Sequence, residues 1–427
     1  MSCRKMREMK DSGIPWIGVI PKDWEVCFIK QIMRNKSIKG YPNEMVLSLY
    51  RDYGVVPKDS RSDNHNVTSE DTSSYKFVEV GDFVINKMKA WQGSMAVSEF
   101  QGIISPAYYI CRFTSKEVDK RYIHYLLRND SYKAEYMRLS SGLRVGQWDL
   151  NIDDFLRIKM VLPSLEEQQA IAEFLDRKCA EVDEMIALQE QIIEELKAYK
   201  QSVITEAVTK GLNPDVPMKD SGIEWIGQIP EHWEVKRLKN IFRLKTGTTP
   251  DGFDIVNEDS EIIPWFTPSD ISDDCCELHQ SERKLYKSEV GEIELFPKGS
   301  LMFVGIGASA GKLGYSHISG YSNQQITALI PDNCNGKYYY YFLIADRKRL
   351  RDNAFFTTLP IINNGYLSQN KVVYPPTTEQ QAIADYLDEK CADIDSLIQT
   401  KQSKIDSLKE YKKSIIYEYV TGKREVE

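Results

Sequence analysis

The feature that most constrains this chain is a long segment that occurs twice. The first copy opens PSLEEQQAIAEFLD at Pro163, and the second opens PPTTEQQAIADYLD at Pro375. Gln168 aligns with Gln380 at a shift of 212 residues, and Tyr199 aligns with Tyr411 at the same shift. Because two copies of one segment adopt one structure, an internal repeat fixes the architecture before any other argument. We therefore expect an internal pseudo-twofold organisation.

Both copies have the pattern of a long helix. Seam residues recur at alternating spacings of three and four, which is typical of a coiled coil. Proline precedes each copy, and Gly211 and Gly422 follow, where glycine ends a helix. The simplest arrangement packs the two copies on each other, and the alternative is two separate amphipathic helices, each covering its own domain. The seam positions are Val182, Ile186, Gln189, Ile193, Leu196, Lys200, Val203 and Ala207, then Ile394, Ile398, Lys401, Ile405, Leu408, Lys412, Ile415 and Tyr419.

A second, shorter repeat precedes each α/β-type region. MKDSGIPWIGVIPKDWEV begins at Met9, and MKDSGIEWIGQIPEHWEV begins at Met218. Glycine, proline and tryptophan at fixed positions indicate a short irregular strap held by aromatic side chains. We expect the four aligned tryptophans to pack in the core and not to bind a ligand: Trp16, Trp24, Trp225 and Trp233.

Two regions of little mutual likeness, about 27–162 and 236–374, lie between the repeats. Each has short apolar runs bounded by turn signals, typical of strands, and a short amphipathic helix late in the region. The sequence thus predicts an α/β (α+β) protein with two compact α/β domains and two long helices. The expected segments are 1–162 (strap and first domain), 163–211 (central helix), 212–374 (strap and second domain) and 375–427 (C-terminal helix).

Composition narrows the class of protein. Eight cysteines with no CxxC pair favour a reducing cytoplasm and disfavour a disulfide framework or a zinc site. No apolar run is long enough to cross a membrane, and no secretory leader is evident. The net charge of −8 lies on the helices, since residues 163–211 carry 5 Lys/Arg against 11 Asp/Glu and residues 375–427 carry 8 against 11. Acidic helices suit a protein partner or plain solvation better than DNA phosphates.

No motif for catalysis emerges. GIGASAGKLG at Gly305–Gly314 follows an apolar run, but its spacing does not match GxxxxGK[ST], and Leu313 stands where a phosphate loop needs Ser or Thr. There is no GxSxG, no HExxH and no polar-Pro-Pro-Tyr stretch for a flipped base. We expect no catalytic residue, no bound metal and no cofactor in this chain.

Polar side chains near strand ends suit DNA recognition. Arg and Lys can read guanine, and Asn and Gln can read adenine. The alternative is that these are loop residues in water, which is the better reading of any single one. The candidates in the first region are Asn86, Lys87, Lys89, Trp91, Gln92, Ser94, Arg144, Gln147 and Trp148. Those in the second are Lys245, Thr246, Thr248, Thr249, Ser269, Ser309, Lys312, Asn323, Gln324 and Gln325.

The order of parts, the EQQAIA helix starts and the IPxxWEV straps resemble the specificity subunit of type I restriction–modification systems over essentially the whole chain. This resemblance implies two target recognition domains, each reading half of a bipartite, asymmetric site in double-stranded DNA. It implies antiparallel helices that set the spacing and bind two modification subunits, which hold S-adenosylmethionine, with restriction subunits joining. We expect the acidic helix faces to form that subunit interface, through Glu181, Glu184, Glu194, Glu195, Asp393 and Asp406.

Two other hypotheses stay open at this point. The chain could be a bifunctional methyltransferase or nuclease acting alone, against which the missing cofactor motifs count. It could also be a coiled-coil adaptor that binds no DNA, against which the basic and aromatic loops count.

Overall fold

The computed structural model describes residues 7–51, 53–61, 71–142, 148–249, 262–273, 276–287, 293–353, 355–356 and 360–426. Contacts divide the chain into two compact units, residues 1–190 with 402–427 (unit 1) and residues 191–401 (unit 2). This division differs from the expected segments, because each long helix contributes one part to each unit and forms no domain of its own. Each unit contains one strap, one α/β region and a part of both helices.

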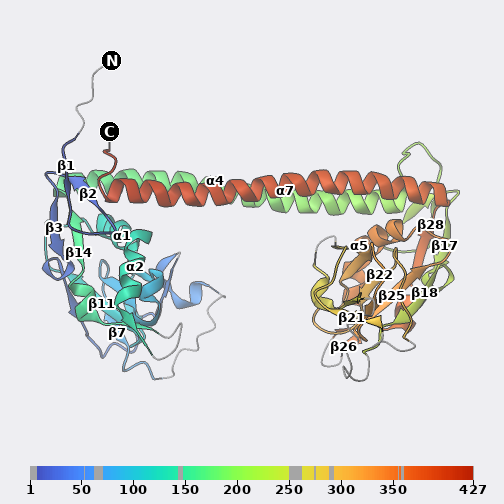
Figure 1. Ribbon diagram of the computed structural model, residues 1–427, viewed down its shortest axis with the longest axis horizontal. Helices are drawn as coiled ribbons and strands as arrows, with labels where there is room; N and C mark the ends of the chain where they lie inside the picture. The colour runs from blue at the N-terminus through green and yellow to red at the C-terminus, as the bar shows by residue number, and fades with distance from the viewer. Residues whose placement is uncertain are drawn as a thin grey trace, which may run out of the picture. The chain divides into compact units, whose positions relative to one another are not determined.

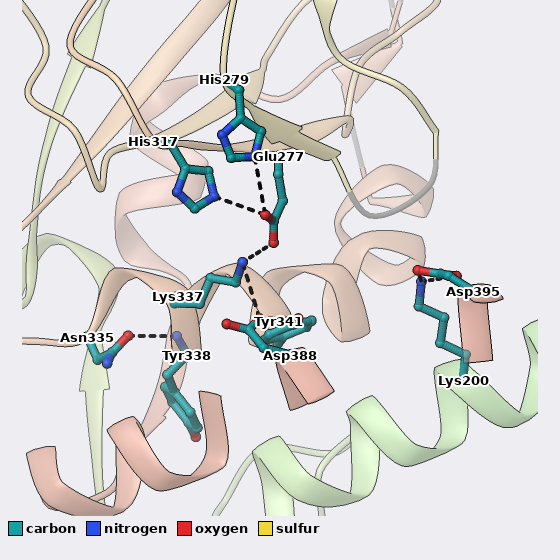
Figure 2. Close-up of polar contacts among 10 residues, drawn as sticks. All are labelled: Lys200, Glu277, His279, His317, Asn335, Lys337, Tyr338, Tyr341, Asp388 and Asp395. Atoms are coloured by element: carbon teal, nitrogen blue, oxygen red, sulfur yellow. Dashed lines mark hydrogen bonds and ion pairs between the residues drawn. The ribbon is translucent and has the colours of Figure 1, made fainter. Parts of the chain in front are cut away.

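The two long helices are α4 (Leu165–Lys210) and α7 (Thr377–Val420) (Figure 1). All sixteen seam positions are buried or half-buried, as the spacing predicts. In unit 1, Lys412 Nζ lies 2.6 Å from Asp183 Oδ2, and in unit 2 Lys200 Nζ lies 2.7 Å from Asp395 Oδ2 (Figure 2). Early residues of α4 thus pair with late residues of α7, and late with early, so the helices run antiparallel within each unit.

The polar side chains of the seam do not all have a partner among the described residues. Lys200 and Lys412 align in the repeat, and so do their partners Asp395 and Asp183, so the two ion pairs are pseudo-twofold equivalents. Gln189, by contrast, is 6% exposed, and its side-chain oxygen has no hydrogen-bond partner among the described residues. Polar groups at seam positions fix helix register at some cost in stability.

A buried glutamine attaches the start of each long helix to its α/β region. Gln168 Nε2 donates to the Pro163 carbonyl at 2.8 Å, and its Oε1 accepts the Asp119 amide at 2.9 Å. Gln380 makes the same two bonds, to the Pro375 carbonyl at 2.8 Å and from the Asn335 amide at 2.8 Å. Both side chains are 0% exposed, where a polar group must be paired. The glutamine of the EQQ motif is therefore structural.

Each strap is a two-stranded hairpin with a buried tryptophan at its end. The hairpins are β1 (Met9–Asp11) with β2 (Val19–Pro21), and β15 (Met218–Asp220) with β16 (Gln228–Pro230). Trp24 Nε1 donates to Glu167 Oε2 at 3.0 Å, and Trp233 Nε1 donates to Glu379 Oε2 at 2.9 Å. These two tryptophans are 1% and 0% exposed, which confirms that they pack.

The strap also contacts the end of the opposite long helix. Gly422, at φ 68°, lies so close to the strap that an added Cβ would be 2.3 Å from Pro21 Cδ. At Gly211, with φ 78°, an added Cβ would lie 3.2 Å from Cζ2 of the Trp233 ring. A positive φ and this close approach both require glycine, so these residues end the helices as the sequence predicts. In each unit the strap therefore contacts the beginning of one helix and the end of the other.

The two α/β regions share a topology that their sequences do not reveal. In unit 1 the sheet order is β4 (Met33–Lys36), β11 (Tyr108–Phe113), β8 (Phe83–Asn86), β9 (Met95–Val97). In unit 2 it is β18 (Phe242–Thr246), β25 (Ile326–Pro331), β22 (Leu301–Val304), β23 (Leu313–Ser316), with β20 (Cys276–Leu278) added in parallel (Figure 1). The registers of β8, β9 and β11 map onto those of β22, β23 and β25 at one shift of 218 residues.

Helices cover each sheet and connect it to the long helices. Tyr122 of α1 (Lys120–Arg128) donates to the Val420 carbonyl at 3.0 Å, and Tyr338 of α5 (Gly336–Asp352) donates to the Val208 carbonyl at 2.8 Å. Burial raises the pKa of both phenols well above the ordinary value, so they remain donors. Other helices are α2 (Asp130–Leu139), α3 (Ile152–Leu156) and α6 (Asn364–Gln369).

Further strands complete each unit. β3 (Glu25–Phe28) pairs with β14 (Lys159–Leu162), and β17 (Glu234–Arg237) pairs with β28 (Lys371–Tyr374), which leads each α/β region into its long helix. The remaining strands of unit 1 are β5 (Leu47–Tyr50), β6 (Gly54–Pro57), β7 (Lys76–Val78), β10 (Gly102–Ile104), β12 (Ser140–Ser141) and β13 (Asp149–Leu150). Those of unit 2 are β19 (Ile262–Phe266), β21 (Lys284–Tyr286), β24 (Tyr321–Ser322), β26 (Phe355–Phe356) and β27 (Pro360–Ile361). Among the described residues, no helix has the length and apolar character needed to cross a membrane.

Replacing Gln380 by alanine should destabilise the protein, because the buried Asn335 amide and Pro375 carbonyl each lose a partner. A buried group left unpaired costs about 1–3 kcal/mol, so we expect a clear fall in the thermal midpoint. The control is Gln381→Ala, next in sequence, whose side chain is exposed and whose hydrogen bonds face water. Equal midpoints for the two variants would contradict this structural role.

Candidate nucleic-acid interface

The loop after β8 in unit 1 is a short 3-10 helix, η3 (Lys87–Gln92). Asn86 caps it, since its Oδ1 accepts the amides of Met88 at 3.1 Å and Lys89 at 3.2 Å. Gly93, at φ 79°, ends it. The strand thus ends at Asn86, and the lysines leave the sheet. The capping oxygen of Asn86 is already occupied, which assigns this residue a structural role.

The side chains of η3 divide into exposed and packed groups. Lys89 is exposed, whereas Lys87 Nζ sits 4.5 Å above the Tyr109 ring. Trp91 makes an edge contact with Trp148, with ring centroids 5.4 Å apart, so the structure joins residues from two separately predicted loops. Gln92 is half-buried, and Ser94 is 3% exposed, so the Ser94 side chain does not reach the surface.

Arg144 and Gln147 lie outside the described residues.

Lys76 and Lys133, which sequence reasoning missed, pack beside these side chains. Lys76 donates to the Tyr108 carbonyl at 2.6 Å and lies 5.5 Å from the Tyr109 ring, beside Lys87. Its pKa is lowered, first by burial and then by the positive charges of Lys87 and Lys39. Lys133 of α2 packs on the loop, since a Cβ at Gly93 would lie 2.9 Å from its Cε. Only strand pairing and helix packing bring these residues here, so no local pattern indicates them.

The equivalent loop of unit 2, residues 304–312, joins β22 to β23. These strands are antiparallel neighbours, whereas a phosphate loop joins a strand to a helix, so the rejection of that motif is correct. Gly311, at φ 89°, occupies the place of Gly93 and faces Arg347 and Arg351 of α5, as Gly93 faces Lys133. In both units a basic helix residue therefore lies against the same glycine of the same loop.

Predicted residues of the second region gather at this edge of the sheet. β18 and β22 end here, and β25 begins here, because β25 is antiparallel to both. Thr249 donates to the side chain of Gln324, and Asn323 Nδ2 donates to Gln325 Oε1 at 3.0 Å. Thr246 and Thr248 are exposed after β18. The sequence-predicted threonine and amide clusters thus meet in one place.

Asn364 at the start of α6 belongs to the same cluster and was missed. Its Nδ2 donates to Thr246 Oγ1 at 2.7 Å, and its Oδ1 accepts from Thr327 Oγ1 at 2.6 Å. Ser269 is exposed and follows β19, which pairs with β24. The Asn323 amide donates to the Phe266 carbonyl at 3.2 Å, so Ser269 lies near the amide cluster. The cluster offers both donors and acceptors, as base edges require.

The charged candidates of unit 2 are partly paired. Lys312 Nζ lies 3.1 Å from Asp273 Oδ2, and Arg347 lies 2.7 Å from Asp273 Oδ1. Hydrogen bonding from Lys312, with Arg347 adding to it, lowers the pKa of Asp273. Lys245 is exposed and lies 4.0 Å from Glu294, while Ser309 is half-buried in the loop. The exposed contact between Lys245 and Glu294 is weak, so Lys245 remains available to an anionic partner.

The acidic residues predicted at a subunit interface lie on the long helices. Glu184, Glu194, Glu195, Asp393 and Asp406 are exposed, and Glu181 is half-buried. Glu181 Oε2 lies 2.6 Å from Lys178 Nζ, and Glu194 Oε1 lies 2.9 Å from Lys197 Nζ, both within one helix turn. These carboxylates point away from the seam and are accessible to a partner.

Comparison with known proteins gives consistent matches. Residues 21–198 and 230–420 each match the sequence family described as "Type I restriction modification DNA specificity domain". The chain is 26% identical to the type I restriction enzyme MjaVIII specificity subunit of Methanocaldococcus jannaschii, over 95% of this chain and 93% of that one.

Solved structures show the same fold. A chain from a study of complex assembly and conformational transition of the type I R-M system has a TM-score of 0.73 at 15% identity, covering 94% of this chain and 98% of its own. The HsdS subunit from Thermoanaerobacter tengcongensis has a TM-score of 0.54 at 16% identity, covering 95% and 98%.

Proposed function

This chain belongs to the family of type I restriction–modification DNA specificity subunits, and from that premise we propose that each of its two units reads one half of a bipartite, asymmetric site in double-stranded DNA. The observation that carries the proposal is the pair of equivalent loops, 86–94 and 304–312, each set against basic side chains from a helix of its own unit. Loops on a rigid sheet are where binding groups tend to sit.

The two loops would read DNA through different chemistry. In unit 1, Lys89 and Lys133 would contact phosphates, while Gln92 and the Trp91–Trp148 pair would enter a groove. In unit 2, threonine hydroxyls and the amides of Gln324 and Gln325 offer hydrogen bonds to base edges. Phosphate contacts position a protein and base contacts specify the sequence. Different side chains in the two units suit an asymmetric site.

We propose that two modification subunits bind the acidic outer faces of the long helices, that they hold S-adenosylmethionine and methylate adenine, and that restriction subunits can join the complex. Specificity subunits are non-catalytic, so this chain would contribute recognition and no catalytic residue or cofactor. The match over both repeats gives no support to a methyltransferase or nuclease acting alone, or to an adaptor that binds no DNA.

Lys89→Ala should weaken binding to all DNA sequences and reduce its salt dependence by a slope of about 1, because a lysine on a phosphate carries no sequence information. The measurement is duplex affinity against salt for the complex with its modification subunits. Lys22→Ala is the control, since Lys22 is exposed on the strap of the same unit and pairs with Glu8. An equally large change in affinity and salt dependence for Lys22→Ala would contradict the assignment of Lys89 to a phosphate contact.

Gln92→Ala should instead relax one position of the half-site read by unit 1, by about 1–3 kcal/mol. Mapping methylated sites in cells expressing the variant with its modification partner measures this directly. The half-site read by residues 236–374 should keep its sequence. Relaxation of that second half-site would reverse the assignment of the loop.

Charge reversal at Glu181 and Glu184 together should weaken assembly with modification subunits while leaving the fold intact, since surface charge changes usually cost little stability. Co-purification measures assembly, and thermal unfolding measures the fold. Reversal of Glu224 and Glu231, exposed acids of the second strap, changes the net charge equally and serves as control. Undiminished co-purification of the Glu181/Glu184 variant would contradict this interface.

A further inference from the structure

In unit 2, two histidines and a glutamate gather at the end of the sheet opposite to the loop of residues 304–312. β20 and β23 are parallel, with Glu277 opposite Tyr315 and Leu278 opposite Ser316. The His317 amide continues the pairing by donating to the Leu278 carbonyl at 3.0 Å. His279 and His317 therefore stand side by side just past the two strand ends. Because side chains alternate along a strand, Glu277 and His279 share one face.

The three side chains converge on one point (Figure 2). His317 Nε2 lies 3.0 Å from Glu277 Oε2, and His279 Nε2 lies 3.7 Å from the same oxygen. The two imidazole rings are stacked, with centroids 4.2 Å apart and planes 9° from parallel. One nitrogen from each ring and one carboxylate oxygen all lie within 4.8 Å of one another. Among the described residues, no other group of three such side chains meets this criterion.

Glu277 is held so that one oxygen faces the histidines. Its Oε1 pairs with Lys337 of α5, and Lys337 Nζ also lies 3.2 Å from Asp388 Oδ1 on α7. Tyr341 donates to the same Asp388 oxygen at 2.6 Å, which fixes that carboxylate in turn (Figure 2). Asp388 compensates the charge of Lys337, and the lysine orients Glu277 Oε1, so that Oε2 faces the two histidines. Such outer contacts orient metal ligands.

A hydrogen-bonded cluster alone accounts poorly for this geometry. A separation of 3.7 Å between His279 Nε2 and Glu277 Oε2 is too long for a hydrogen bond. Both rings nevertheless present Nε2 to the same carboxylate oxygen. A cation between the three atoms would use a lone pair from each.

We propose that Glu277, His279 and His317 bind one divalent transition-metal ion, with zinc as the best match. Two imidazoles and one carboxylate are the protein ligands of an open zinc site, in which water takes the remaining position. Tetrahedral bonds of about 2.0–2.1 Å place ligand atoms roughly 3.4 Å apart, so the two rings rotate out of their stack to direct both Nε2 lone pairs at one ion. The side chains of the three residues are 38%, 66% and 35% exposed, so an ion can enter from solvent.

Unit 1 shows which part of this arrangement belongs to the common scaffold. Arg121 of α1 pairs with Asp176 of α4 at 3.1 Å, and Asp176 aligns with Asp388 in the long repeat. Tyr125 donates to Asp176 at 2.7 Å, as Tyr341 does to Asp388. The ion pair between short and long helix is thus common to both units. The histidine pair is an addition to unit 2, where the ion would tie β20, the outermost strand of the sheet, to β23.

The test uses the purified full-length chain, stripped of metal with a chelator and titrated with zinc chloride by calorimetry. We expect one zinc ion per chain, and at least a tenfold loss of affinity for His279→Ala and for His317→Ala. His232→Ala is the matched control, because His232 is also an exposed histidine, 2.7 Å from Glu379, but lacks a second histidine beside it. It should bind zinc as the unsubstituted chain does.

Two further measurements separate this site from other causes. Cobalt(II) absorption should lack thiolate charge-transfer bands, which would appear if any of the chain's cysteines bound the ion. Zinc should raise the thermal midpoint of the unsubstituted chain but not of the His279→Ala/His317→Ala variant, and without metal both should unfold at similar temperatures. Zinc affinity unchanged in both histidine variants, no zinc binding at millimolar concentration, or thiolate bands with cobalt would each overturn the proposal.

Discussion

A hydrogen bond from a buried tryptophan to a glutamate in the first turn of a long helix holds each unit together. Trp24 reaches Glu167 and Trp233 reaches Glu379, and each tryptophan also packs beneath the glycine that ends the other long helix. The carboxylate satisfies the indole N–H of the buried tryptophan, and it lies at the helix end where negative charge is favourable. The start of one helix and the end of the other are thereby fixed to the same strap.

This arrangement makes each unit depend on both long helices. The core of unit 1 includes Tyr419 and Val420 from the last turn of α7, packed with residues that lie hundreds of positions earlier. The core of unit 2 likewise includes Ile204 and Val208 from the last turns of α4. The Lys200–Asp395 and Lys412–Asp183 pairs add a polar constraint on the helix register within each unit. A unit cut from the chain without its second helix would expose apolar surface that the strap and sheet normally cover.

The two units share one scaffold and differ in the side chains of their surface loops. The strap, the buried glutamine, the core tyrosine that caps a helix carbonyl and the sheet register occur in both. The surface loops differ, since residues 86–94 form a capped 3-10 helix and residues 304–312 a glycine-rich connection of equal length. A rigid frame tolerates such changes because loop residues contribute little to the core, so recognition can vary while stability is kept.

The sequence by itself determined the parts whose signals are local or repeated. Helix periodicity, the bounding proline and glycine residues and the tryptophan straps could all be read directly, because each depends on residues a few positions apart. Only the tertiary structure decided that two dissimilar regions share one sheet topology, that Ser94 is buried while Trp91 meets Trp148, and that Lys76 joins Lys87 at Tyr109. It also brought His279 beside His317 across two paired strands. These outcomes depend on which strands pair and in which register, and that choice is made by long-range packing that no local pattern records.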